Sequence, residues 1–139
     1  MRTLREEIIA CSEGQVRILE VDGSPIAKPR DGEPDQSCEL TFRFGDDFTG
    51  FRGHFPGHPI LPAFVQLLMA ECAVCLHHAR PWSLRRAERG KFLKPIGPNE
   101  PVTVCWQEQP QDDGLRCNFT LRAGAQRAAV FALELTAPA

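Results

Sequence analysis

The segment from Phe51 to Pro62, FRGHFPGHPILP, gathers chemically useful residue types within a short stretch of chain. Its three prolines exclude regular structure and fix the backbone φ angle, while its two glycines allow close backbone approach. His54 and His58 therefore lie on a stiff loop that leads into the apolar stretch after Pro62. The start of a helix there would offer free N–H groups to a carbonyl oxygen that develops negative charge. A purely structural loop with packed histidines is the alternative.

The stretch from Pro62 to Ala79 must position this loop. It is apolar except for Gln66, Glu71, His77 and His78. Ala, Leu and Met favour helix, and proline suits a first helical turn. We therefore predict one long helix, apolar nearly all round and buried by the rest of the domain. Its central polar residues and short apolar runs argue against a membrane span.

Alternating apolar and polar residues predict β-strands around this helix. Ser37–Phe44 alternates without a fault, and Gln15–Val21 does so less cleanly. The remaining strands are expected over Gly90–Lys94, Val102–Trp106, Leu115–Arg122 and Ala129–Leu135, with turns at Asp112–Gly114 and Ala123–Ala125. Asp22–Gln36 is rich in Gly, Pro and charge, which predicts a loop. Consecutive strands with short turns form an antiparallel meander, so the sequence predicts a single α+β domain over residues 1–139.

Two motifs resemble a known family. HFPGHPILP, followed by an apolar helix, is similar to the (3R)-hydroxyacyl-[acyl-carrier-protein] dehydratases. Lys91–Glu100, KFLKPIGPNE, is similar to the segment that opens the later strands in that family. The resemblance covers roughly residues 37 to 136. It implies the hotdog fold, in which an antiparallel sheet wraps around one long buried central helix.

The resemblance also implies an activity and a site. The family removes water from a 3-hydroxyacyl thioester carried by acyl carrier protein. By this resemblance His54 is the base or proton relay at the α-carbon, and the N–H of Ala63 polarises the thioester carbonyl. Gly57, Pro62, Ala63 and Leu68 are expected to contact the substrate, and no cofactor or metal is expected. The family usually has glycine at position 63, so the alanine methyl group crowds this point.

One position departs from the family pattern. The family places Glu or Asp fourteen residues after the histidine to help hydroxide leave, and here that residue is Leu68. The nearest carboxylate is Glu71, about one helical turn later on a similar face. Glu71 is either a replacement acid or a structural residue with a basic partner, because burying an unpaired carboxylate is costly. Without any acid, dehydration should be slower by a factor of about 10²–10⁴.

The six cysteines do not suggest a disulfide framework. A chain of this size with no apolar leader after its N-terminal MRTLREE is expected to be cytoplasmic and to keep its thiols reduced. Cys72 and Cys75 form a lone CxxC pair inside the apolar helix, where buried small hydrophobes are a better interpretation than a metal site with His77 and His78.

Charge and composition limit the partners. A net charge of −2 makes a globally basic nucleic-acid binder a poor interpretation. The stretch from Arg80 to Lys94 contains six basic residues and a single acidic residue. It is therefore either a docking patch for an acidic carrier protein or a solvated edge. We expect a substrate that is a thioester of acyl carrier protein or CoA. Because exposed sheet edges invite pairing, we also expect a homodimer or an oligomer of dimers.

Two alternatives to a dehydratase stay open. The first is a non-catalytic hotdog subunit that binds an acyl chain or pairs with an active dehydratase, having lost its acid at Leu68. The second is an acyl thioesterase on the same fold.

Overall fold

The structure is a computed structural model that describes residues 2–19, 37–51, 57 and 59–137. The predicted loop over Asp22–Gln36 lies outside these residues, as do His54 and His58. No helix in the described part of the chain is long and apolar enough to cross a membrane.

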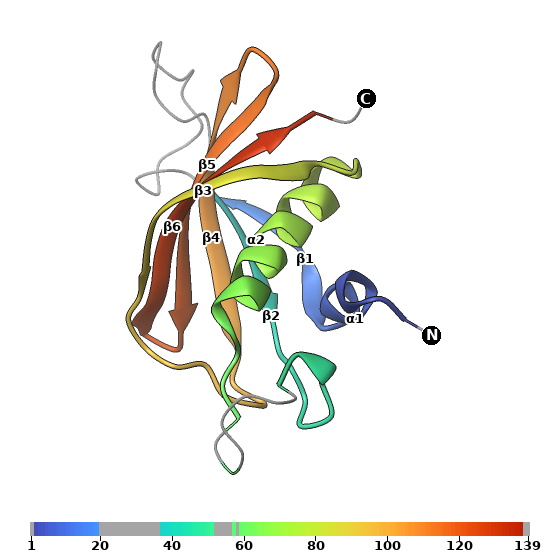
Figure 1. Ribbon diagram of the computed structural model, residues 1–139, viewed down its shortest axis with the longest axis vertical. Helices are drawn as coiled ribbons and strands as arrows, with labels where there is room; N and C mark the ends of the chain where they lie inside the picture. Colours follow the sequence, from blue (N-terminus) through green and yellow to red (C-terminus); the bar gives the residue numbers. More distant parts are fainter. Residues whose placement is uncertain (1, 20–36, 52–56, 58, 138–139) are drawn as a thin grey trace.

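An antiparallel sheet and two α-helices make up the fold (Figure 1). The helices and the short 3-10 turn are α1 (Leu4–Ala10), η1 (Thr49–Phe51) and α2 (Ala63–His78). The strands are β1 (Ser12–Leu19), β2 (Ser37–Phe42), β3 (Ser83–Phe92), β4 (Val102–Gln111), β5 (Gly114–Ala123) and β6 (Gln126–Thr136). Their order in the sheet is β1-β2-β4-β5-β6-β3, so β1 and β3 are its edges. The predicted α+β architecture is confirmed.

The predicted meander is the centre of the sheet. β4 pairs with β5 and β5 with β6, with turns after Gln111 and Ala123. β2 then joins β4, with Cys38 opposite Trp106. Along β2 the alternate residues are buried, as the sequence pattern predicts, and the buried series continues to Phe44 beyond the end of the strand.

The long helix α2 lies across one face of this sheet (Figure 1). It spans nearly the predicted residues, with Pro62 as its N-cap and Ala79 as its C-cap. Val65, Met69 and Ala73 point into the core and are fully buried. The helix is not buried on every side, however, because Phe64 is 56% exposed at its start. The apolar outer side of α2 is thus left partly uncovered within one chain.

Two elements differ from the prediction. β3 begins at Ser83, well before the expected Gly90, because its pairing with β6 already starts at that residue. It lies at the edge of the sheet, with β6 as its neighbour. Its residues are nearly all exposed, so the strand has no apolar alternation to detect. The helix α1 is not predicted at all. Thr3 caps it by accepting a hydrogen bond from the N–H of Glu6, and its one fully buried side chain is Ile8.

Candidate active site

The start of α2 is exposed, and no side-chain cap is found there among the described residues. Its N-cap is Pro62, and no described side chain bonds to the first N–H groups. The carbonyl of Pro62 accepts from the N–H groups of Val65 and Gln66. Ala63 and Phe64 are exposed. These two residues present backbone N–H groups at the positive end of the helix dipole, which is the arrangement that an oxyanion needs.

The chain that leads to this helix is anchored to the rest of the fold. The N–H of Leu61 donates to the carbonyl of Ile96 at 2.8 Å, which ties the start of α2 to the segment before β4. Gly57 is exposed and has a φ of +86°, a backbone conformation that glycine adopts without strain. The predicted roles of His54 and His58 stay predictions, because both residues lie outside the described part of the chain.

Gln66 lies in the first turn of α2 and is 4% exposed. Its Nε2 donates to the carbonyl of Leu61 at 3.1 Å. Its Oε1 is buried and has no partner among the described residues. A buried amide at the start of this helix therefore holds the entering chain in place and keeps one acceptor available. In the sequence, Gln66 stands out only as a polar residue in a mostly apolar helix.

Leu68 lies half-buried on α2, five residues after Ala63 or about 7.5 Å along the helix. It packs against the edge of the hydrophobic core, where the resemblance places a carboxylate. The nearest carboxylate on the same helix is Glu71, three residues later. The position to which the resemblance assigns the leaving-group acid is therefore apolar in this chain.

Glu71 is buried beneath α1 and forms an ion pair with Arg5. Arg5 Nη1 donates to Glu71 Oε1, and Arg5 Nη2 donates to the Cys75 sulfur at 3.8 Å. Burial by itself lowers the pKa of Arg5, but the hydrogen bond and charge of Glu71 raise that pKa above its ordinary value. The structure thus supplies the basic partner that a structural role for Glu71 requires. No local pattern pointed to Arg5 as this partner, since 66 residues separate the pair.

All six cysteines are free, as expected for reduced thiols. Cys72 is fully buried, and burial raises its pKa to about 12. Cys75 donates to the carbonyl of Trp82 at 3.4 Å. Cys72 and Cys75 therefore act as packing groups at ordinary pH, because a thiol must ionise before it can attack as a nucleophile.

The basic residues between Arg80 and Lys94 lie mainly along the edge strand β3. Arg86 pairs with Glu88 at 2.9 Å, and Lys94 pairs with Glu100 at 2.6 Å. Among the described residues, no ion pair involves the exposed side chains of Arg85, Arg89 and Lys91. This edge of the sheet is therefore basic where it faces solvent.

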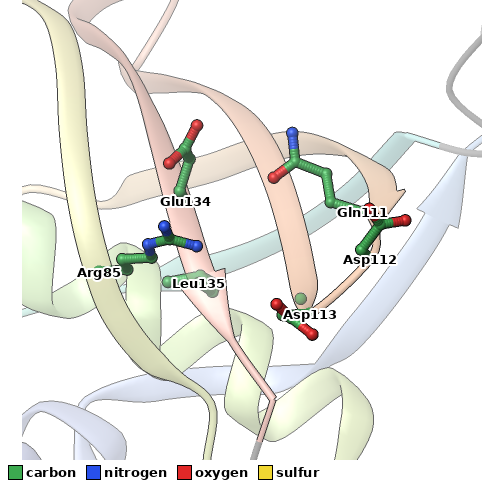
Figure 2. Close-up of a pocket in the computed structure, with 7 residues that line it drawn as sticks. Arg85, Gln111, Asp112, Asp113, Glu134 and Leu135 are labelled. Carbon is green, nitrogen blue, oxygen red and sulfur yellow. The ribbon is translucent and has the colours of Figure 1, made fainter.

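One pocket of about 430 Å³ lies away from the start of α2. Figure 2 shows Arg85, Glu134 and the turn between β4 and β5 around it. This turn is at the end of β4, whereas the start of α2 bonds to Ile96, ahead of the first residue of that strand. The two ends of β4 are about 30 Å apart. The pocket is polar and holds none of the residues predicted for the thioester site.

Comparison with known proteins agrees with this architecture. Residues 30–132 match a protein-family model described as ApeI-like, ApeI dehydratase. A search of curated proteins gives no match. Among solved structures, a chain of the dehydratase heterocomplex ApeI:P from Xenorhabdus doucetiae is 23% identical with a TM-score of 0.60, covering 81% of this chain and 98% of that one.

Two further structures extend the comparison. An uncharacterized protein from Erwinia carotovora subsp. atroseptica is 25% identical with a TM-score of 0.58, covering 73% of this chain and 84% of that one. A hypothetical thioesterase with coenzyme A from Streptococcus pneumoniae TIGR4 is 9% identical with a TM-score of 0.61, covering 97% and 94%. The predicted hotdog fold is confirmed by these neighbours.

Proposed function

This chain belongs to the ApeI-like dehydratase family, and from that premise we propose that it removes water from a 3-hydroxyacyl thioester. The observation that carries the proposal is the exposed start of α2, where no described side chain bonds to the first N–H groups, shortly after the histidine-bearing segment. Carrier protein or CoA would hold the acyl chain as a thioester. The basic edge along β3 suits an acidic carrier protein, because opposite charge steers docking.

The proposed chemistry divides between a base and a helix end. His54 takes a proton from the α-carbon, and the thioester carbonyl oxygen accepts hydrogen bonds at the start of α2 from the N–H of Ala63. The enolate charge is then stabilised by the helix dipole. Loss of the 3-hydroxyl group forms the double bond, and that oxygen must gain a proton to leave as water.

The source of that last proton separates two candidate functions. Leu68 has no proton to give, and the carboxylate of Glu71 is already engaged by the guanidinium of Arg5. Glu71 also lies eight residues from Ala63, about 12 Å along the helix. These observations favour the second candidate, a hotdog subunit with little activity of its own that pairs with an active dehydratase. The heterocomplex of the Xenorhabdus relative is a precedent for pairing in that protein.

The experiment is turnover of one 3-hydroxyacyl thioester by purified full-length protein, with enoyl product and free thiol followed together. For a dehydratase, wild type forms enoyl product and His54→Ala abolishes it without a change in melting temperature. His58→Ala is the matched control and should keep most activity. Equal losses in both variants would contradict the role of His54, and free thiol without enoyl product would indicate a thioesterase.

Two further variants identify the acid. If Glu71 protonates the leaving group, Glu71→Gln lowers turnover by at least about 100-fold. Full activity in Glu71→Gln removes it from the mechanism and leaves the ion pair with Arg5 as its role. An inert wild type that gains activity in Leu68→Glu would instead favour the non-catalytic subunit.

A further inference from the structure

A cluster of three metal-ligating side chains lies at the opposite end of α2 from the proposed thioester site. Cys38 is on β2, Glu108 is on β4, and His77 is in the last turn of α2. One ligand atom from each lies within 4.8 Å of the other two. The Cys38 sulfur is 3.8 Å from Nε2 of His77. None of these residues takes part in the chemistry proposed above.

The strand register explains why these groups meet. Cys38 is paired with Trp106 across β2 and β4. Glu108 is two residues after Trp106, so its side chain points to the same face of the sheet. α2 ends over this face and brings His77 against it, with the His77 ring 6.1 Å from that of Trp106. Three elements thus direct one ligand each toward a common point.

The carboxylate of Glu108 is held in position by two neighbours. The indole Nε1 of Trp106 donates to Oε1 at 2.9 Å. Nε2 of His78 lies 3.0 Å from Oε1 and 2.9 Å from Oε2. Such outer contacts orient a ligand and increase metal affinity. The carboxylate is therefore fixed in place before any ion binds.

We propose that Cys38, His77 and Glu108 bind a divalent transition-metal ion, with Zn²⁺ as the ion that their chemistry favours. A thiolate and an imidazole select zinc over magnesium or calcium, which prefer oxygen ligands. Around a tetrahedral zinc ion, sulfur and nitrogen ligands lie about 3.6 Å apart, close to the separation between Cys38 and His77. The ion would fasten the end of α2 to β2 and β4.

Charge at this point also suits a dication. The thiolate of Cys38 and the carboxylate of Glu108 together carry two negative charges, which neutralise Zn²⁺. The C-terminal end of a helix adds a partial negative charge. Binding displaces the proton of the Cys38 thiol, which passes to solvent while the sulfur–metal bond forms. The fourth ligand is a water molecule, and a pocket of about 360 Å³ lies against His77, one of the three proposed ligands.

The test uses the full chain, free of any histidine tag and treated with a chelator, and adds Zn²⁺ or Co²⁺ alone. We expect about one ion per chain and a higher melting temperature when the ion is present, because an ion that binds the folded state stabilises it. Bound Co²⁺ should show the charge-transfer absorption that thiolate ligation produces. If neither Zn²⁺ nor Co²⁺ binds at about one ion per chain, the proposal is overturned.

Variants show whether these residues hold the ion. Cys38→Ala should abolish the charge-transfer absorption, and both Cys38→Ala and His77→Gln should weaken binding at least ten-fold. Cys105→Ala is the matched control, since Cys105 is on β4 beside Trp106 and points to the other face. Circular dichroism checks that each variant is folded. If Cys38→Ala does not fold, His77→Gln still tests the site, because it changes a side chain that is only half-buried. Unchanged binding in either folded variant, or equal losses in Cys105→Ala, would contradict the site.

Discussion

At the scale of single residues, the buried thiol of Cys72 links stability to pH. Burial raises its pKa to about 12, from an ordinary value of 9.0. Between these two values the unfolded chain loses this proton and the folded chain keeps it, so the free energy of unfolding falls as pH rises. From pH 8 to pH 10 this one thiol should remove about 1 kcal/mol. Below pH 8 it has no effect. Urea unfolding of metal-free protein across this range measures the fall.

The matched variant isolates this thiol from other groups that titrate in alkali. Cys72→Ala should flatten the fall in stability above pH 9. Cys105→Ala should flatten it less, because that thiol is partly exposed whereas Cys72 is fully buried. An identical slope in wild type and Cys72→Ala would show that Cys72 ionises equally in both states.

At the scale of elements, the hairpin between β4 and β5 depends on Gly114. A Cβ atom at this position would lie 1.8 Å from the carbonyl oxygen of Leu135 on β6. Backbone cannot yield as a flexible side chain can, so Gly114→Ala should destabilise the protein by about 3 kcal/mol or more. Gly124→Ala in the next hairpin is the control. Its Cβ would meet nothing within 4 Å, and only its φ of +64° adds about 1 kcal/mol of strain. Chemical denaturation of both variants tests this, and equal losses would contradict it.

At the scale of the whole molecule, the exposed apolar side chains predict a dimer. The edge strand β3 carries Leu84 at 38% exposure and Phe92 at 46%, and Phe64 at the start of α2 is 56% exposed. An edge strand with apolar residues invites pairing with a second chain. Sedimentation at micromolar concentration should therefore give about twice the monomer mass of 15.5 kDa.

A charge on the pairing edge should separate the two chains. Leu84→Glu is expected to shift the sedimenting mass toward the monomer. Ile18→Glu places the same charge on the other edge strand, β1, where the wild-type side chain is 49% exposed. This control should leave the dimer intact. A wild-type monomer would refute the prediction. Dissociation by Ile18→Glu but not by Leu84→Glu would show that the chains pair through β1 and not through β3.

The elements that bury one face could be predicted from the sequence. β2 and β5 alternate because every second side chain meets the core, and α2 is apolar because it lies against the sheet. The same reasoning fails for β3, whose exposed position at the edge imposes no period. The short helix α1 escaped prediction because it buries only Ile8 completely, which is too little to set a pattern.

Three features could be identified from the order of residues alone: the histidine-bearing segment, the helix that follows it and the apolar residue at position 68. Those features depend on residue types at close spacing, which local chemistry can interpret. The pairing of Arg5 with Glu71 and the convergence of Cys38, His77 and Glu108 became visible with the folded structure. These contacts join residues far apart in the chain, and they arise from the order of strands in the sheet and the way helices cross its face. Hydrophobic periodicity records which face of an element is buried, but it does not record which distant element covers that face.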